Sequence, residues 1–200
     1  TDLYEAIKFA SDRGVATLIS TNGELLTEKN IKKLLESGLD FIKIAISGFS
    51  QDIYTVQHRG CHIEKIKDNL KSLARLRDEG RYKILIMLDY VYYQYNSHEY
   101  KPALDFGQKL DFMVSRRPGN LFKLSEEHPE LARHEKPQEP PKNLPVKELC
   151  DWPWKVMTVD WNGDIFPCCD YVVWNNQEPN ATFEVGKSNI KEIWNGPSVV

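Results

Sequence analysis

Cysteine is scarce in this chain, and positive charge is not in excess. The 200 residues include four cysteines and carry a formal net charge of −3. A chain without surplus positive charge lacks the electrostatic footprint of a nucleic-acid-binding protein, so we expect no nucleic-acid partner. The longest apolar run, Ile84–Leu88, is far shorter than the roughly 20 residues of a membrane span, so we expect no membrane association either.

Targeting features are also missing from the sequence. No signal peptide is visible, although the chain begins at Thr1 rather than at a methionine. Four cysteines do not form the dense framework of a small secreted domain, so we expect a reducing, cytoplasmic setting. Hydrophobic residues make up 41% of the chain. That content and this length fit one globular domain, or one domain with a small additional module.

Residues 1–115 alternate between helical and strand patterns. Apolar residues recur at helical spacing in four segments, and four short apolar runs lie between or after them. Near-continuous apolar strands joined by helices predict an α/β fold with a parallel sheet and right-handed crossovers. The predicted helices are 2–13, 27–38, 61–79 and a segment that begins at Asn96; the predicted buried strands are 15–20, 41–47, 83–92 and 112–115.

Two features of this pattern bear on function. In parallel α/β folds the site lies at the carboxyl ends of the strands. Here those ends are Thr21-Asn22-Gly23, Ser47-Gly48 and the segment 92–96. Asn96 and Glu99 have the spacing of a capping box, which predicts that they close the first turn of the fourth helix.

The composition changes after residue 115. Residues 116–145 hold six of the eleven prolines, which predicts a linker between two parts of the chain. All five tryptophans lie at Trp152 or later, as expected of a small module, 146–200, whose core depends on aromatic residues and a metal site. A short amphipathic helix is predicted over 188–195.

Three of the four cysteines lie close together in this module. Cys150 is followed by twelve residues, Gly163, four more residues and then Cys168 and Cys169. Asn162-Gly163 between β-prone segments predicts a hairpin, which would bring Cys150 near Cys168. Soft thiolates gathered in this way suit an iron–sulfur cluster or zinc. Buried thiols and a disulfide are the alternatives. Because the five histidines all lie at or before His134, further ligands here would be Asp151 or Asp170.

These motifs resemble a known family. The chain is similar to radical S-adenosylmethionine enzymes with a SPASM-type auxiliary-cluster domain. C-x12-G-x4-C from Cys150 to Cys168 resembles the opening of the SPASM motif, and IKEIWN at 190–195 resembles the helix after it. The segments TNG at 21–23, ISG at 46–48 and HRG at 58–60, with Tyr54, resemble the strand-end segments of the family.

The sequence departs from the family pattern at both ends. The CxxxCxxC loop that holds the catalytic [4Fe-4S] cluster in the family is absent here, and so are the later SPASM cysteines. We therefore expect this chain to be a fragment that cannot perform radical chemistry by itself. The fold that the resemblance implies is a partial (β/α) TIM-like barrel over 1–115, followed by an incomplete Cys-rich hairpin and helix module.

The resemblance also implies roles for individual residues. Cys150 and Cys168 would be ligands of an auxiliary [4Fe-4S] cluster, and Cys169, next to Cys168, is a further candidate ligand. Asn22 and Gly23 would shape the floor of the cofactor cleft. Gly48, which follows Ser47, would be part of the same cleft. Ser47 would present its hydroxyl group to S-adenosylmethionine, although the residue two positions earlier, often serine in relatives, is Ala45. Arg59 would pair with the cofactor carboxylate, a task that suits its planar guanidinium. No catalytic residue is assigned.

The activity implied is generation of a 5′-deoxyadenosyl radical that modifies a peptide, protein or small-molecule substrate. A flavodoxin or ferredoxin would supply electrons. Two other hypotheses remain open from the residues alone. One is a non-enzymatic α/β domain with a structural zinc or iron–sulfur knuckle for partner binding, and the other is an ordinary α/β enzyme with buried cysteines.

Overall fold

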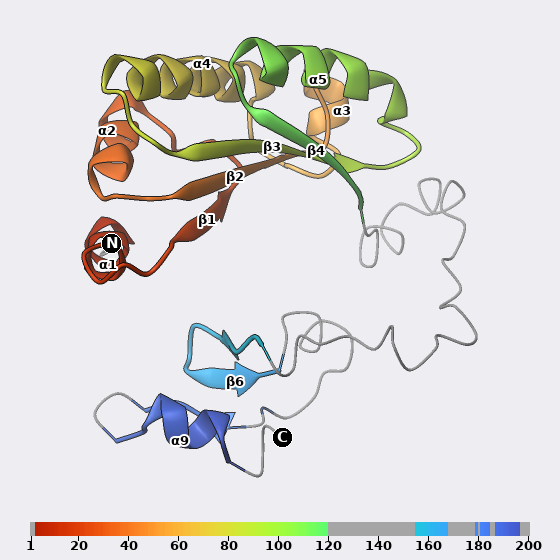
Figure 1. The fold of residues 1–200 in the computed structure, drawn as a ribbon. Coiled ribbons are helices and arrows are strands. Elements are labelled where there is room, and N and C mark those ends of the chain that lie inside the picture. The colour runs from red at the N-terminus through yellow and green to blue at the C-terminus, as the bar shows by residue number, and fades with distance from the viewer. Residues whose placement is uncertain (1–2, 120–154, 168–178, 180, 185–186, 197–200) are drawn as a thin grey trace. The chain divides into compact units, whose positions relative to one another are not determined.

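The chain divides into two compact units, residues 1–137 and 138–200, which are described separately (Figure 1). The computed structural model describes residues 3–119, 155–167, 179, 181–184 and 187–196. The three clustered cysteines of the C-terminal unit lie outside these residues. Within the described part, no helix has both the length and the apolar character needed to cross a bilayer.

The N-terminal unit is built on a four-stranded sheet with the order β1-β2-β3-β4. All three strand pairs are parallel. The predicted α/β fold with a parallel sheet is therefore confirmed. Consecutive strands lie next to each other, so their carboxyl ends share one edge. The strands are β1 (Leu18–Thr21), β2 (Phe41–Ile46), β3 (Leu85–Tyr92) and β4 (Met113–Pro118).

The helices α2, α4 and α5, which lie between consecutive strands in the sequence, cover one face of the sheet (Figure 1). The Thr27 side chain accepts a hydrogen bond from the Asn30 backbone N–H at 3.4 Å, so Thr27 caps the start of α2. Ile63, Ile66, Leu70 and Leu73 of α4 are buried at helical spacing. The helices are α1 (Leu3–Ser11), α2 (Glu28–Glu36), α3 (Gln51–Tyr54), α4 (Ile63–Glu79), the 3-10 turn η1 (Ser97–Glu99) and α5 (Tyr100–Lys109).

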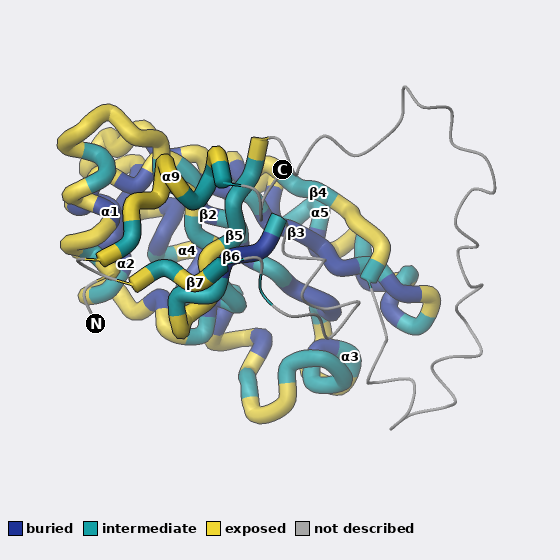
Figure 2. Tube along the Cα trace, turned by 90° about the horizontal axis from the view of Figure 1, so that it is seen from below, coloured by how far each residue is buried: buried dark blue, intermediate teal, exposed yellow. Residues whose placement is uncertain are grey.

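Buried residues alternate with intermediate ones along β2, so the two faces of the sheet differ in burial (Figure 2 colours the chain by burial). Ile42, Ile44 and Ile46 of β2, together with Ile86 and Leu88 of β3, are buried under α2, α4 and α5 and form the main core. Alternate residues of the same strands point the other way. On that opposite face, which we call the open face, Leu18, Leu85 and Met113 are each more than half exposed.

Three predictions need correction. The segment 15–20 was expected to be a buried strand, but β1 begins at Leu18, and Val15 and Leu18 are each 56% exposed. β1 pairs only with β2 among the described strands, so it is an edge strand. The predicted linker was expected to begin at residue 116, but β4 continues to Pro118 because its residues 116–118 pair with 90–92 of β3. Asn96 makes no side-chain cap.

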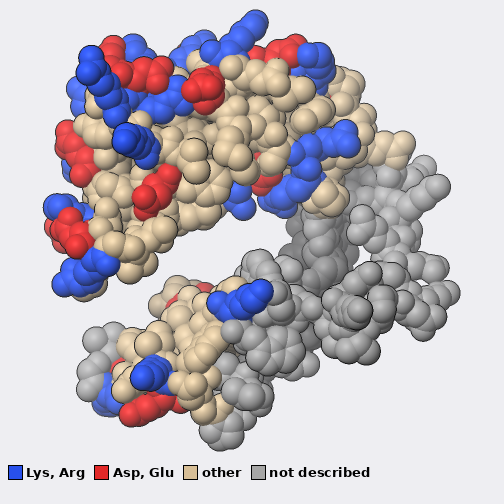
Figure 3. Space-filling model, in the orientation of Figure 1, with Lys and Arg blue, Asp and Glu red and all other residues tan. Residues whose placement is uncertain are grey.

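The outer surface of the helices carries charged side chains of both signs. Figure 3 shows Lys and Arg side chains interspersed with Asp and Glu over the helical side of the N-terminal unit. Many of them form ion pairs with a residue one helical turn away. Examples are Lys8 with Asp12, at the end of α1, and Lys101 with Asp105 in α5. Exposed pairs of this kind contribute little stability.

The described part of the C-terminal unit contains a small antiparallel sheet, β5-β6-β7. β5 (Thr158–Val159) and β6 (Asp164–Phe166) form the predicted hairpin around Asn162-Gly163, and β7 (Ala181–Thr182) pairs with β6. Gly163 has a φ of +92°, and an added Cβ would lie 2.5 Å from the Phe183 carbonyl oxygen. Only glycine suits this turn. The predicted helix is α9 (Ile190–Trp194), capped by Asn189.

Candidate functional site

The carboxyl ends of the strands bring together segments that are far apart in the sequence. The parallel register aligns Thr21 of β1 with Ile44 of β2, and Ile46 of β2 with Tyr90 of β3. The turns that follow β1, β2 and β3 therefore meet at one edge, as the sequence predicted. This edge is the candidate site, and its floor is made of three turns.

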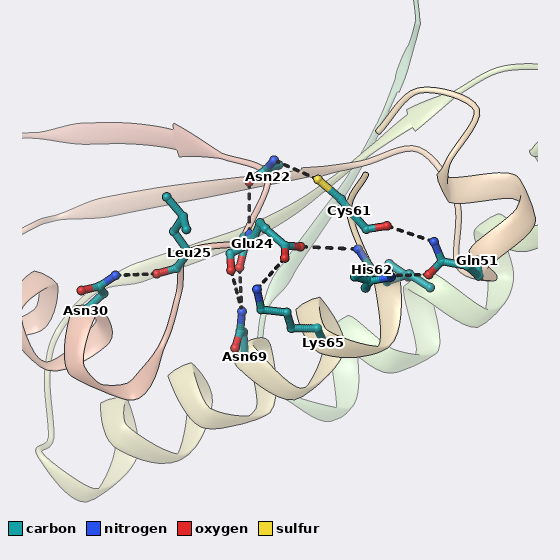
Figure 4. A network of polar contacts seen from close by, with 11 residues as sticks. Asn22, Glu24, Leu25, Asn30, Gln51, Cys61, His62, Lys65 and Asn69 are labelled. Carbon is teal, nitrogen blue, oxygen red and sulfur yellow. Dashed lines mark hydrogen bonds and ion pairs between the residues drawn. The ribbon is translucent and has the colours of Figure 1, made fainter. Parts of the chain in front are cut away.

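The turn after β1 is fixed by its own side chains. Asn22 Oδ1 accepts a hydrogen bond from the Glu24 backbone N–H at 3.1 Å, and Thr21 Oγ1 accepts one from the Gly23 N–H at 3.1 Å. Gly23 is buried with a φ of +81°, and an added Cβ would lie 3.1 Å from Ile66. Asn22 and Gly23 therefore fix the course of this turn through local geometry, while their role in a cofactor cleft stays a prediction. The Asn22 amide also points to Cys61 Sγ, at 3.7 Å (Figure 4).

Hydrogen bonds join the same turn to α4 (Figure 4). Glu24 accepts a hydrogen bond from Lys65 Nζ at 2.5 Å, and Asn69 Nδ2 donates to the Gly23 carbonyl at 2.9 Å. The hydrogen bond from Lys65 is the main cause that lowers the pKa of Glu24. At the beginning of α4, Gln51 of α3 donates to the Cys61 carbonyl and accepts from the Ile63 N–H. The strand-end turn, α3 and α4 thus form one polar network.

The turns after β2 and β3 are joined by Asn96, which is fully buried. Its Nδ2 donates to the Ser47 carbonyl at 2.8 Å and to the Val91 carbonyl at 2.9 Å, and its Oδ1 accepts from the Tyr93 N–H at 2.8 Å. The Tyr90 hydroxyl group donates to the Asn96 carbonyl at 2.7 Å. Both polar atoms of this side chain are used, so Asn96 holds the Ser47 turn against the end of β3.

Glu99 makes a second link between the same turns. Its carboxylate accepts hydrogen bonds from the backbone N–H groups of Phe49 at 2.5 Å and Ser50 at 3.1 Å. Burial by itself raises the pKa of Glu99, but these hydrogen bonds outweigh it, and the net pKa lies below the usual value. The predicted capping box is therefore wrong. Asn96 and Glu99 bind residues of another turn instead of their own helix.

Gly48 has a packing role. An added Cβ at Gly48 would lie 2.5 Å from the Tyr54 backbone nitrogen and 2.8 Å from its Cα. Backbone atoms cannot move aside as a flexible side chain can, so α3 lies against this turn only because residue 48 is glycine. The structure thus gives Gly48 a positioning role beside Ser47.

Two buried polar atoms at this edge, Ser47 Oγ and Tyr54 OH, have no hydrogen-bond partner among the described residues. Gln57 Nε2 and Tyr95 OH make no hydrogen bond of regular geometry either, but the Gln57 side chain lies close enough to the Tyr95 hydroxyl group to affect its pKa. Ser47 is 1% exposed and Tyr54 is fully buried. Burial raises the pKa of both Tyr54 and Tyr95, so both phenols are neutral at pH 7. An unpaired buried polar atom is uncommon, and it is one signature of a ligand-binding position. Ser47 was predicted from the sequence, whereas no sequence signal pointed to the other three as a group.

The loop after α3 carries the remaining predicted residue. Arg59 is exposed on this loop. His58, next to it, stacks on Tyr54 with ring centroids 4.3 Å apart and planes 9° apart. Burial lowers the pKa of His58, so this histidine is neutral at pH 7. The structure therefore brings the loop to the same edge as Tyr54, while the pairing of Arg59 with a cofactor stays a prediction.

The predicted metal ligands Cys150, Cys168 and Cys169 lie outside the described residues, as do Asp151 and Asp170. Among the residues that the structure does describe, no group of three His, Cys, Asp or Glu side chains is arranged to hold a metal ion. The described part contains one cysteine, Cys61, which is a free thiol.

Comparison with known proteins gives independent findings. Residues 150–200 match the SPASM family model, an iron-sulfur cluster-binding domain. The uncharacterized protein MJ0804 of Methanocaldococcus jannaschii is 37% identical over 71 residues, which are 36% of this chain and 25% of that protein. The tungsten-containing aldehyde ferredoxin oxidoreductase cofactor-modifying protein of Pyrococcus furiosus is 24% identical over 95% of this chain and 62% of its own length.

A solved structure shares the fold. Streptococcus suis SuiB superposes with a TM-score of 0.66 at 14% identity, over 98% of this chain and 52% of SuiB. SuiB has also been solved bound to S-adenosylmethionine and bound to the precursor peptide SuiA, with TM-scores of 0.65 and 0.63. The chain spans about half the length of SuiB. Residues 150–200 thus match the SPASM iron–sulfur cluster-binding domain, and the chain resembles the radical S-adenosylmethionine enzymes that carry this domain.

Proposed function

We propose that this chain is part of a radical S-adenosylmethionine enzyme that modifies a peptide substrate. The match of residues 150–200 to the SPASM domain carries the proposal. It is supported by a SuiB-like fold and by a strand-end edge that contains unpaired buried polar atoms. The proposed fold of the whole is a (β/α) TIM-like barrel, of which residues 1–115 form part, with a linker at 116–145 and a Cys-rich hairpin module at 146–200.

S-adenosylmethionine would bind at the edge formed by the three strand-end turns. The residues present fit a ligand with hydroxyl, amino and carboxylate groups. Ser47 offers a buried hydroxyl group that has no hydrogen-bond partner among the described residues, and Arg59 is exposed on the loop after α3. Asn22, Gly23 and Gly48 set the course of the backbone around the ligand. When bound to a reduced [4Fe-4S] cluster, S-adenosylmethionine supplies a 5′-deoxyadenosyl radical that abstracts hydrogen from a substrate.

The proposed clusters differ in where their ligands lie. The auxiliary [4Fe-4S] cluster would be held in part by Cys150 and Cys168, with Cys169 as a further candidate, because thiolates are the usual ligands of such clusters. The ligands of the catalytic cluster would lie outside this chain, since its sequence has no CxxxCxxC segment. No residue of the chain is proposed as catalytic.

The substrate proposal rests on a relative. SuiB was solved with the precursor peptide SuiA, which favours a peptide over a small molecule as the substrate here. A flavodoxin or ferredoxin is the proposed electron donor, and the proposed compartment is the cytoplasm, where thiolate ligands stay reduced.

Metal analysis of purified protein tests the cluster proposal. The chain would be prepared without oxygen, reconstituted with iron and sulfide, and assayed for bound iron, sulfide and zinc. We expect iron and sulfide to be bound and to fall by at least half in Cys150→Ser and Cys168→Ser, because each variant removes a thiolate ligand. Cys61→Ser is the matched control and should keep its iron, since Cys61 contacts Asn22 in the other unit.

Two results would contradict the proposal. Stoichiometric zinc without iron would favour a structural knuckle that binds a partner. Unchanged metal content in both variants would favour buried thiols in an ordinary α/β domain. Binding of S-adenosylmethionine is tested separately by calorimetric titration of the wild type and of Ser47→Ala, for which we expect weaker binding by about tenfold, the usual effect of removing one hydrogen bond to a ligand.

A further inference from the structure

The open face of the sheet carries a buried carboxylate that no step above uses. Asp89 lies in the middle of β3, and its side chain is 3% exposed. Ser115 Oγ donates to one carboxylate oxygen at 2.6 Å, and Arg117 Nε donates to the other at 2.6 Å. Both donors come from β4. Because Ser115 is the register partner of Asp89 and Arg117 follows two residues later, all three side chains lie on the same face of the sheet.

The burial of Asp89 by itself destabilises the folded state. Aspartate is disfavoured in strands, and taking a carboxylate out of water costs several kcal/mol unless its partners compensate. An apolar residue at this position would pack against Ala45 and Val91 of the same face without that cost. What Asp89 achieves is the orientation of the Arg117 guanidinium.

The guanidinium of Arg117 is used only in part. Nε binds Asp89, whereas the two terminal NH₂ groups make no hydrogen bond to any residue that the structure describes. The side chain is 50% exposed, so these groups are accessible. An arginine held at Nε presents a fixed planar fork, and this geometry matches the two oxygens of a carboxylate.

The surroundings favour an organic acid over a small inorganic anion. Lys43 of β2 lies on the same face and forms no ion pair with a described residue. Asp89 is the one acidic residue among the strand positions of this face, so Lys43 and Arg117 leave it with a net positive charge. On either side of these polar residues the face is apolar, with Leu85 and Met113 towards one end of the strands and Val91 and Tyr93 towards the other.

We propose that Arg117, oriented by Asp89, binds the side-chain carboxylate of an acidic residue in the peptide substrate, with Lys43 adding positive charge. Asp89 is then a positioning residue. The identification of the ligand as the substrate rests on the proposed function, whereas the binding of a carboxylate does not.

Short peptides test this proposal without requiring radical chemistry. The probes are acetyl-Ala-Glu-Ala-amide, its glutamine counterpart, and acetyl-Ala-Ala-Ala with a free carboxyl terminus, each titrated into the purified protein and followed by NMR chemical shifts. The glutamate peptide should bind about two- to fivefold more tightly than the glutamine peptide, as expected for one ion pair at a half-exposed site. This preference should weaken as salt is added.

Single substitutions test which residues produce the preference for the glutamate peptide. Arg117→Gln should abolish the preference for glutamate, and Arg117→Lys, which keeps the charge but lacks the fork, should retain only part of it. Asp89→Asn should reduce the preference while circular dichroism stays unchanged. Arg116→Gln is the matched control, because Arg116 is the next residue of the same strand but stacks over Tyr92 and Tyr100 on the other face, and it should leave the preference intact.

Several outcomes would overturn the proposal. Equal binding of the glutamate and glutamine peptides would do so, and so would a preference that persists in Arg117→Gln. Preference for the free carboxyl terminus alone would assign Arg117 to a different carboxylate. If Arg117→Gln weakens the binding of S-adenosylmethionine and leaves the peptides unaffected, the guanidinium serves the cofactor. Loss of cofactor binding in every protein, with the peptide preference intact, would instead refute the proposed function and leave this inference standing.

Discussion

Replacing Asn96 with alanine should be among the most damaging single changes in the N-terminal unit. The substitution removes three side-chain hydrogen bonds, to Ser47, Val91 and Tyr93. Each hydrogen bond contributes about 1–1.5 kcal/mol to stability, so we expect the free energy of unfolding to fall by about 3–4 kcal/mol. That is a large part of the 5–15 kcal/mol that typically separates a folded domain from its unfolded state.

Urea unfolding measures this loss. For a slope of roughly 2 kcal/mol per molar urea, the midpoint should fall by about 1.5–2 M. The two units can be followed separately, because all five tryptophans lie at Trp152 or later. Tryptophan fluorescence therefore reports on the C-terminal unit, and far-ultraviolet circular dichroism is dominated by the helices of the N-terminal unit. Only the second signal should shift.

Asn30→Ala provides the matched control. Asn30 also donates through its side chain to a backbone carbonyl, that of Leu25 at 2.8 Å, but this hydrogen bond is exposed (Figure 4). Its loss should cost less than about 1 kcal/mol, since water replaces the lost partner. If Asn96→Ala costs no more than Asn30→Ala, the conclusion that Asn96 joins the two turns is wrong.

Three further predictions concern the same edge of the sheet. Ser47→Ala should leave stability within about 0.5 kcal/mol of wild type in urea unfolding, because the hydroxyl group has no partner to lose; a loss above about 2 kcal/mol would show that the hydroxyl is structural. Gly48→Ala should destabilise by more than about 2 kcal/mol, because the new Cβ meets the Tyr54 backbone. Gly60→Ala, whose Cβ would meet no atom within 4 Å but whose φ is +77°, should cost only about 1 kcal/mol; equal costs would contradict the packing argument. Glu99→Gln should be less stable than wild type at neutral pH. Since the pKa of Glu99 is lowered in the folded state from its ordinary 4.5, its stabilisation is present above that pH and is lost on acidification. The difference between the two proteins should therefore shrink below about pH 4.5, and a gap that is constant with pH would argue against this role.

Local patterns in the sequence predicted most elements of the N-terminal unit. The spacing of Ile63, Ile66 and Leu70 indicated α4, and the apolar run at 41–47 indicated β2, because helices and buried strands have characteristic side-chain periods. Asn162-Gly163 predicted the turn of the β5-β6 hairpin for a similar reason. These signals act over a few residues, so they can be recognised without knowledge of the fold.

Local patterns failed where a side chain serves a distant partner. Asn96 and Glu99 have the spacing of a capping box, but Glu99 binds backbone groups 49 and 50 positions away. The run at 15–20 looks like a buried strand, yet its exposure depends on what lies beside β1. Neither outcome is encoded in the neighbouring residues.

The sequence by itself determined the order of helices and strands and the turns at their ends, since these follow from periodicity and from the backbone preferences of glycine and asparagine. It also contained residues 150–200, which match the SPASM domain. Only the tertiary structure decided which polar groups remain unpaired at the strand ends, and that Asp89, Ser115 and Arg117 meet on one face. A hydrogen bond between strands depends on register and on which face each side chain occupies, and both are set by packing across the whole sheet.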